Sequence, residues 1–330
     1  MISFIMRRLF LALATTWAIS VMSFVIIQLP PGDFVDAYIA RLSATGSPVS
    51  MEEAQSMRTL YGLDQPYYVQ YAKWMSRVLK GDFGESMEWQ RPVTDVLGDR
   101  LWLTVVVSFA ALLLTWTLAL PIGIYSAVRQ YSIGDYVFTF IGFIGLAVPN
   151  FLLALIVLYL AFRWFGLNVG GLFSAEYELA PWSWAKFGDL MWHLPLAALI
   201  LALAGTAQLI RIMRANLLDE LRKPYVVTAR AKGLSETRVI LKYPVRAALN
   251  PFASALAYLF PYLVSGSIII SLVLSLPTVG PVLLRALIAQ DMYLAGTIVL
   301  LLGVLTVVGT FISDLVLMWI DPRIRHQVDQ

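Results

Sequence analysis

The sequence predicts an all-α integral membrane protein, and three observations support this class. Hydrophobic residues make up 59 % of the 330 residues and charged residues only 14 %, and the mean hydropathy of +0.74 is too apolar for a soluble globular chain. Apolar runs of about 20 residues, the length that crosses a bilayer as a helix, recur along the chain. Basic residues gather between alternate runs, as is typical of the cytoplasmic side of a membrane protein.

Six apolar runs are long enough to span a bilayer. The first, Leu9 to Leu29, follows Arg7 and Arg8 and has no cleavage site behind its apolar core, so residues 1–29 are expected to remain as transmembrane helix 1. With the basic segments inside, residues 1–29 and the tail 321–330 both place a terminus in the cytoplasm. The other five runs lie in a membrane core of residues 100–320, at Leu101 to Val128, Tyr136 to Phe162, Met191 to Ile210, Phe252 to Leu276 and Tyr293 to Ile320.

Residues 30–99 form a long polar stretch that begins at Pro30-Pro31-Gly32-Asp33. The stretch is expected to be an extracytoplasmic insertion, because a segment of this length can be translocated whatever its charge. Capping residues predict a helix that starts after Ser50 and ends at Gly62, and a second over Tyr67 to Lys80. The aromatic residues of the second helix fall at helical spacing, which favours packing over ligand stacking.

The segment from Arg211 to Arg246, expected as a cytoplasmic loop, contains nine basic and three acidic side chains. Pro224 suits the first turn of a helix and Gly233 suits its end, so a short helix is predicted over Tyr225 to Lys232. At 1.5 Å per residue it is roughly 12 Å long, too short to be stable without a partner surface. A bland alternative is a charged loop that only orients the protein and touches anionic lipid.

No catalytic, cofactor-binding or metal site is predicted. The chain lacks cysteine and has no phosphate-binding loop of the type G-x-x-x-x-G-K-[S/T], and its two histidines, His193 and His326, stand alone. The predicted spans offer few ionisable residues, Asp314 among them, which disfavours a self-contained channel or secondary carrier. Small polar residues give a possible translocation pathway, although each also suits helix packing: Pro149, Asn150, Gln208, Ser265, Ser267 and Ser271.

Six stretches spread over the whole chain carry a resemblance to a known family. The stretches are Arg7-Arg8 with Leu29-Pro30-Pro31-Gly32-Asp33, Tyr61-Gly62-Leu63-Asp64-Gln65-Pro66 with Gln70-Tyr71 and Trp74, Gly81-Asp82-Phe83-Gly84-Glu85-Ser86, Ala147-Val148-Pro149-Asn150-Phe151, Thr228-Ala229-Arg230-Ala231-Lys232-Gly233-Leu234, and Asp321-Pro322-Arg323-Ile324-Arg325. Through them the chain resembles the membrane permease subunits of bacterial binding-protein-dependent ABC importers, and within them the first permease subunit type of the oligopeptide/dipeptide group.

The resemblance implies a type I ABC importer permease fold with six transmembrane helices in the bacterial inner membrane. It also implies a second permease subunit in a heterodimer, an extracytoplasmic substrate-binding protein, and two ATP-binding subunits or domains that bind ATP and Mg, so that this chain needs no cofactor and is not an enzyme. No nucleic-acid partner is implied. The short helix becomes a coupling helix that docks on the ATPase through Tyr225, Val226, Thr228, Ala229, Arg230, Ala231, Lys232, Gly233 and Leu234.

The chain departs from the family pattern at three places that bear on its partners and solute. Where the wider family often has Glu-Ala-Ala, this chain has Val227-Thr228-Ala229, so no carboxylate is available there for the ATPase. Ser271 stands where peptide permeases frequently carry glutamate, and Thr278 where they usually have the glycine of Pro-Gly-x-Gly. Peptides or similar small polar solutes remain the expected cargo, and oligosaccharides or sugar conjugates are the alternative.

Overall fold

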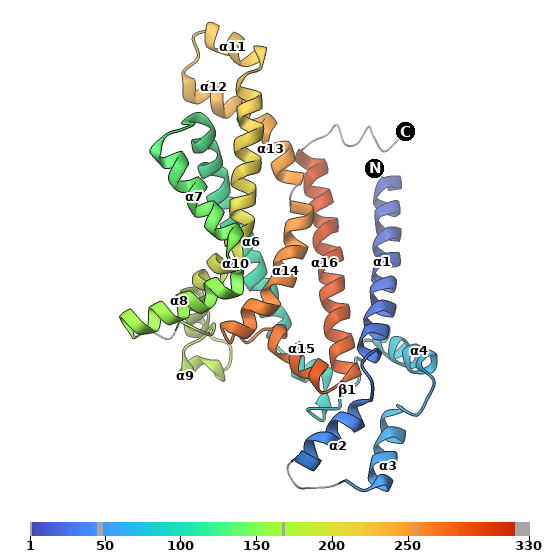
Figure 1. The fold of residues 1–330 in the computed structure, drawn as a ribbon. Coiled ribbons are helices and arrows are strands. Elements are labelled where there is room, and N and C mark those ends of the chain that lie inside the picture. Colours follow the sequence, from blue (N-terminus) through green and yellow to red (C-terminus); the bar gives the residue numbers. More distant parts are fainter. Residues whose placement is uncertain (1, 45–48, 167–168, 255, 321–330) are drawn as a thin grey trace. The chain divides into compact units, whose positions relative to one another are not determined.

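The computed structural model describes residues 2–44, 49–166, 169–254 and 256–320, which form helices joined by short turns (Figure 1). The predicted tail 321–330, with its Asp321 to Arg325 stretch, lies outside the described residues. The chain divides into two compact units. The first unit comprises Ile2–Trp102 and Thr278–Val308, and the second comprises Leu103–Pro277 together with the residues from Gly309 onward.

The first unit contains the N-terminal helix and the polar segment, by which we mean residues 30–99. The predicted capping signals are confirmed: Ser50 accepts a hydrogen bond from the Glu53 N–H in a capping box, and Gly62 ends the helix with a left-handed φ of 69°. Its elements are α1 (Ile2–Gln28), α2 (Phe34–Ala44), α3 (Met51–Tyr61), α4 (Tyr67–Val78), β1 (Glu85–Ser86), β2 (Arg91–Pro92), α5 (Val93–Leu97), α15 (Val279–Ile288) and the first part of α16 (Met292–Ile320).

Aromatic packing fixes α4 against α1 within the first unit. Trp74 is only 1 % exposed, and its ring stacks on Phe24 with the centroids 6.3 Å apart. Tyr71 lies edge-on to Phe24, and its hydroxyl shares a 2.8 Å hydrogen bond with Ser20. The packing predicted from helical spacing is therefore confirmed for Tyr71 and Trp74.

A buried carboxylate joins the polar segment to the start of α16. Asp291 is 0 % exposed and lies immediately before the helix. Its Oδ2 accepts hydrogen bonds from the Ser86 hydroxyl at 2.6 Å and the Glu88 N–H at 3.1 Å, and its Oδ1 accepts one from the Leu294 N–H at 3.1 Å. Because it holds the β1 strand and the first turn of α16 together, Asp291 is a structural tie between sequence segments about 200 residues apart.

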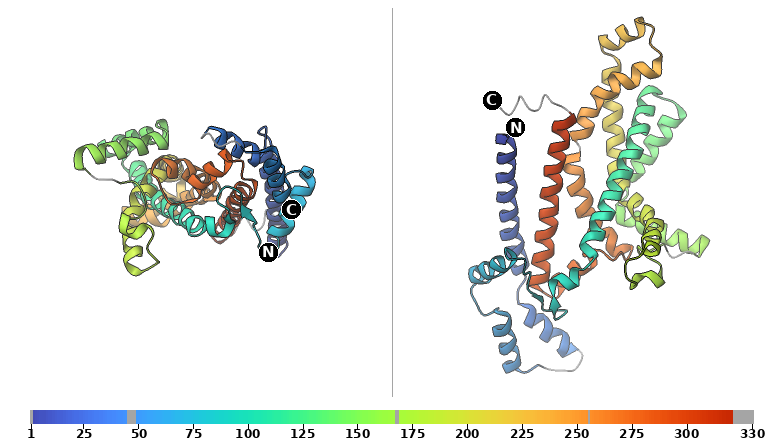
Figure 2. Two further views of the ribbon diagram at one scale, coloured as in Figure 1. Left: turned by 90° about the horizontal axis from the view of Figure 1, so that it is seen from below. Right: turned by 180° about the vertical axis from the view of Figure 1, so that it is seen from behind.

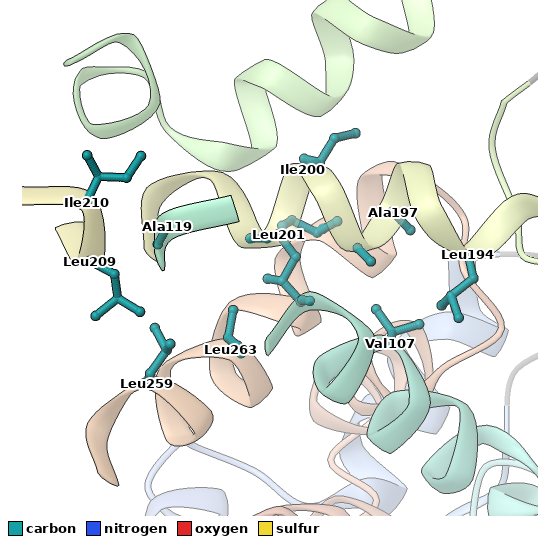
Figure 3. Close-up of a cluster of buried hydrophobic side chains, with 14 of the residues drawn as sticks. Val107, Ala119, Leu194, Ala197, Ile200, Leu201, Leu209, Ile210, Leu259 and Leu263 are labelled. Carbon is teal, nitrogen blue, oxygen red and sulfur yellow. The ribbon is translucent and has the colours of Figure 1, made fainter. Parts of the chain in front are cut away.

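The second unit is organised around one long helix, α10. Leu201 and Leu209 of α10 pack with Val107 of α6 and with Leu259 and Leu263 of α14 in a continuous buried cluster (Figure 3). The elements of this unit are α6 (Arg100–Val128), α7 (Ile133–Ala147), α8 (Asn150–Phe165), α9 (Ala175–Glu178), α10 (Trp184–Leu221), α11 (Pro224–Ala231), α12 (Glu236–Lys242), α13 (Pro244–Ser254) and α14 (Leu256–Val273).

Four described helices, α1, α6, α10 and α16, are long and apolar enough to cross a membrane. The run predicted as a span over Tyr136 to Phe162 is a bent pair of helices, because α7 and α8 meet at an angle of 107°. Pro149 lacks an N–H and disfavours helix at the preceding residue, and Val148 is extended, with φ −92° and ψ 124°. The run at Phe252 to Leu276 contains α14, whose apolar part is shorter than a span, so the count of six remains a prediction.

The start of the basic loop also needs correction. The sequence predicts a span over Met191 to Ile210 that ends at Ile210. In the structure α10 continues without a break to Leu221. Arg211 and Arg214 therefore belong to a helix, because a polar sequence with good helix formers can extend an apolar one. Figures 1 and 2 place α11 and α12 at one end of α10 and the α9 loop at the other.

Candidate functional site

The short helix predicted in the basic segment is present as α11. Pro224 occupies its first turn, where the missing N–H costs no hydrogen bond, and Gly233 follows its C-cap, Lys232, with a left-handed φ of 74°. Thr228 satisfies its own hydroxyl by donating to the Pro224 carbonyl at 3.1 Å. We call α11 and α12 together, Pro224–Lys242, the coupling segment.

One face of α11 is used inside the chain. Val226 and Ala229 are 0 % and 5 % exposed and pack on Val239 of α12, with Leu234 and Tyr243 partly buried around them. The sequence placed Val226, Ala229 and Leu234 among the residues that contact a partner. In the structure these three side chains pack α11 against α12.

The opposite face of α11 is exposed in the described chain. We call it the outer face, and its residues follow the i, i+3, i+4, i+7 spacing of one helix side. Val227, 60 % exposed, lies at its centre and was missed by the sequence analysis, because periodicity alone cannot tell which side of an eight-residue helix is buried. The outer face is small and nearly uncharged: Pro224, Val227, Thr228 and Ala231.

Polar side chains on the two flanks of α11 are bonded to neighbouring elements. The Tyr225 hydroxyl donates to Glu220 of α10 at 2.5 Å, and Lys223 forms an ion pair with the same carboxylate at 2.6 Å. Burial, together with this hydrogen bond, raises the pKa of Tyr225 to about 12. Arg230 donates to both carboxylate oxygens of Glu236 at 2.5 to 3.2 Å, and this hydrogen bonding lowers the pKa of Glu236.

A second ion pair links α10 to α7 two turns before Glu220. Arg214 donates to both oxygens of Asp135 at 2.9 and 3.1 Å, and Asp135 also accepts the Tyr131 N–H. The Asp135 side chain is 4 % exposed. The partners are 79 residues apart in sequence, so no local pattern predicts the pair. The sequence offers only Ser132, whose side chain caps α7 by accepting the Asp135 N–H. α10 therefore contacts both the coupling segment and α7 through charged side chains.

The residues of the predicted pathway do not share one environment. Pro149, Gln208 and Ser265 are exposed and Asn150 is half-buried. Ser267 and Ser271 are buried, and the Ser267 hydroxyl donates to the Val264 carbonyl at 2.7 Å. The Ser271 hydroxyl has no hydrogen-bond partner in the described residues, and the pathway formed by the six residues stays a prediction.

The outer face of α11 and its flanks are suited to binding another protein. In the described residues, no three His, Cys, Asp or Glu side chains gather as a metal ion would need. Lys232 and Gly233 are exposed beside the outer face. Tyr225 and Arg230 are also exposed, but their side chains already donate hydrogen bonds to Glu220 and Glu236. A small, uncharged helix face with charged flanks can insert into a groove of another protein with little desolvation cost.

Known proteins match the chain over nearly its whole length. Residues 119–326 match the family described as the binding-protein-dependent transport system inner membrane component, and residues 1–108 match the N-terminal part of such membrane components. The oligopeptide transport system permease protein AppB of Bacillus subtilis strain 168 is 33 % identical, over 99 % of this chain and 100 % of that protein.

Two further relatives cover a similar share of the chain. The peptidoglycan transport system permease protein YejB of Agrobacterium fabrum is 30 % identical, over 98 % of each protein. The inner membrane ABC transporter permease protein YejB of Escherichia coli O157:H7 is 31 % identical, over 98 % of this chain and 99 % of that protein.

Proposed function

Because the chain belongs to the family of inner membrane components of binding-protein-dependent transport systems, we propose that it is the transmembrane subunit of an ATP-driven importer, coupled to its ATPase through α11. The single observation that supports this coupling is the exposed outer face of α11, on a helix too short to be stable alone.

The bonds around α11 explain how force on the helix reaches the spans. A push on the outer face is received by a helix whose flanks are tied to α10 through Glu220 and to α12 through Glu236. α10 is continuous from Trp184 to Leu221, and Arg214 connects it to α7. Motion of α11 is transmitted because each link is a packed helix or a charge-assisted hydrogen bond.

The solute is a peptide or a similar small polar compound. One relative is named an oligopeptide transport permease, which supports peptides. Another is named a peptidoglycan transport permease, and this name also fits the alternative of sugar conjugates. The chain forms half of the translocation pathway and a second permease subunit forms the other half. The six residues of the predicted pathway line this chain's half.

The assembled importer contains partners that supply the chemistry. Two ATP-binding subunits or domains hold ATP and Mg and hydrolyse the nucleotide, while this chain is non-catalytic. A substrate-binding protein delivers the solute on the extracytoplasmic side of the inner membrane, where the polar segment lies. The coupling segment and both chain termini lie in the cytoplasm, in agreement with the distribution of basic residues.

A bulky substitution on the outer face tests this function. Ala231→Trp should leave the chain folded, because Ala231 is exposed, yet abolish co-purification with the ATP-binding subunits and transport in proteoliposomes. The matched control is Thr237→Trp, which adds the same side chain at an exposed position of α12. Normal ATPase binding and transport by Ala231→Trp would contradict the proposal.

A further inference from the structure

The first unit contains a cavity that α11 and the pathway do not involve. Its volume is about 600 Å³, within the range of roughly 300 to 1,000 Å³ that small-molecule sites occupy. α3, α4, the strand β1 and the start of α16 form its walls, all of them in the same compact unit. The lining side chains that carry the argument are Gln65, Lys73, Arg77, Asp82, Glu85 and Tyr293.

Charges of both signs line this cavity. Lys73 and Arg77 are four residues apart on α4 and so lie on one side of the helix. Asp82 and Glu85 follow α4 in the chain, so the cavity has two cations and two carboxylates. None of the four takes part in an ion pair within the described part of the chain.

Other charges of the polar segment do find partners. Arg58 pairs with Asp33 at 2.8 Å, and Arg41 pairs with Glu88 at 2.7 Å. The segment can therefore neutralise charges internally where its geometry brings them together. Three of the four charged residues around the cavity are exposed and Glu85 is half-buried, and they form no such pairs, although Asp82 Oδ1 accepts the Gly84 N–H at 2.9 Å. Accessible charges of both signs at one cavity are the arrangement expected of a site that binds a ligand of complementary charges.

Gln65 also lines this cavity. The side-chain oxygen Oε1 of Gln65 is buried and has no hydrogen-bond donor in the described residues. The lining is closely packed where Gly84 meets Tyr293, because a Cβ at Gly84 would lie 3.2 Å from the Tyr293 ring.

We propose that this cavity binds a zwitterionic amino acid or short peptide. Asp82 and Glu85 receive its free ammonium group, and Lys73 and Arg77 receive its free carboxylate, through charge-assisted hydrogen bonds. The site goes beyond the proposed coupling function, since it lies in the first unit and does not depend on α11.

Calorimetric titration of the full chain in lipid nanodiscs, without partner subunits, tests the site. The probe is trialanine with free ends, compared with trialanine that is acetylated at its N-terminus and amidated at its C-terminus. The free tripeptide is expected to bind at least about tenfold more tightly, because only it carries both charges. Equal affinities, or no binding of the free tripeptide, would overturn the proposal.

Variants separate the two ends of the ligand. Arg77→Leu should weaken binding of the free tripeptide about tenfold, and Arg77→Lys, which retains the charge, should weaken it less. Glu85→Gln should weaken the free tripeptide but not N-acetyl-trialanine, which has no ammonium group. Lys80→Leu, an exposed lysine outside the cavity, is the control and should change nothing.

The same variants distinguish a ligand site from a protein contact. If Arg77→Leu leaves tripeptide binding unchanged but weakens association with the substrate-binding protein, the cavity is a protein-docking surface and the proposal is wrong. Loss of tripeptide binding in Arg77→Leu, with helix content retained by circular dichroism, supports it.

Discussion

The polar segment and the coupling segment are both built from short helices, yet they are held in different ways. The polar segment has a core of Phe34, Val35, Ala54 and Met87, to which the aromatic contacts of Trp74 are added. The core of the coupling segment consists of three small side chains, Val226, Ala229 and Val239. Buried apolar area is the main source of stability, so the first segment is self-supporting and the second is marginal.

The charged contacts repeat this contrast. Asp291 is completely buried and bonded to three donors in the first unit, whereas the Arg230 and Glu236 side chains of the coupling segment are 44 % and 55 % exposed. Exposed pairs contribute little because water screens them. The comparison teaches that the coupling segment keeps one helix face free at the expense of its own core, and that a partner surface completes its packing.

The largest expected effect is on the aromatic core of the polar segment. Trp74→Ala should lower the free energy of unfolding by about 3 to 5 kcal/mol. Trp74→Phe should cost less than half as much, because it keeps most of the ring contacts and removes an Nε1–H that has no acceptor in the described residues. Denaturation in detergent, with hydrogen exchange of the α4 amides, measures both. Equal losses for the two variants would show that this core does not stabilise the segment.

A smaller effect is expected at Asp291. Asp291→Asn replaces one acceptor oxygen by a donor, leaving a buried N–H group unpaired at a cost of about 1 to 3 kcal/mol. Burial raises the pKa of Asp291 above its ordinary 3.8, against the opposing effect of the hydrogen bonds from Ser86, Glu88 and Leu294.

The pH dependence of the Asp291 contribution has a definite sign. A raised pKa means that the folded state binds the proton more tightly, so the contribution is greatest below 3.8 and declines as the pH rises through the raised value. The difference in unfolding free energy between the wild type and Asp291→Asn should therefore shrink over this window. A difference that grows with pH would contradict the account.

Tyr225→Phe should have a modest effect on the coupling segment, at most about 1 kcal/mol, because the hydroxyl is partly exposed to solvent. With a pKa of about 12 in place of 10.0, the neutral phenol persists to high pH. Its contribution is fully present below pH 10.0 and is lost as the pH rises toward 12. Ultraviolet titration of tyrosinate, wild type minus variant, measures this. A titration near pH 10 would show that the bond to Glu220 is absent.

The smallest effect is expected for Glu236→Gln. The carboxylate is exposed and its ion pair with Arg230 lies at the surface, so its loss should leave the thermal unfolding of the chain unchanged within error. Hydrogen exchange of the α11 and α12 amides checks whether the segment loosens locally. A marked drop in stability would mean that the exposed pair, and not the small core, holds the segment together.

Local signals in the sequence predicted much of the fold. Ser50 and Gly62 mark α3, and Pro224 and Gly233 mark α11, because caps and turns depend on a few adjacent residues. The sequence shows a proline at Pro149, but hydropathy alone predicts a single apolar run there. Hydropathy gives the length of an apolar run and not the angle between its two halves.

Contacts between distant residues were beyond the sequence analysis. The pair of Asp135 with Arg214 and the bond of Ser86 to Asp291 join residues far apart in the chain, and nothing in their local patterns indicates a partner. The inward orientation of Val226 and Ala229 depends on where α12 packs. Such contacts are set by tertiary structure, so a single sequence without structural information cannot supply them.

Site-directed photo-cross-linking tests the central claim most directly, since the chain contains no cysteine of its own. Ala231→Cys and Lys80→Cys, both exposed, are labelled with a benzophenone maleimide and irradiated in the assembled importer. The account predicts that the label on Ala231→Cys forms an adduct with an ATP-binding subunit and that the label on Lys80→Cys does not. An ATPase adduct from Lys80→Cys, or none from Ala231→Cys, would contradict it.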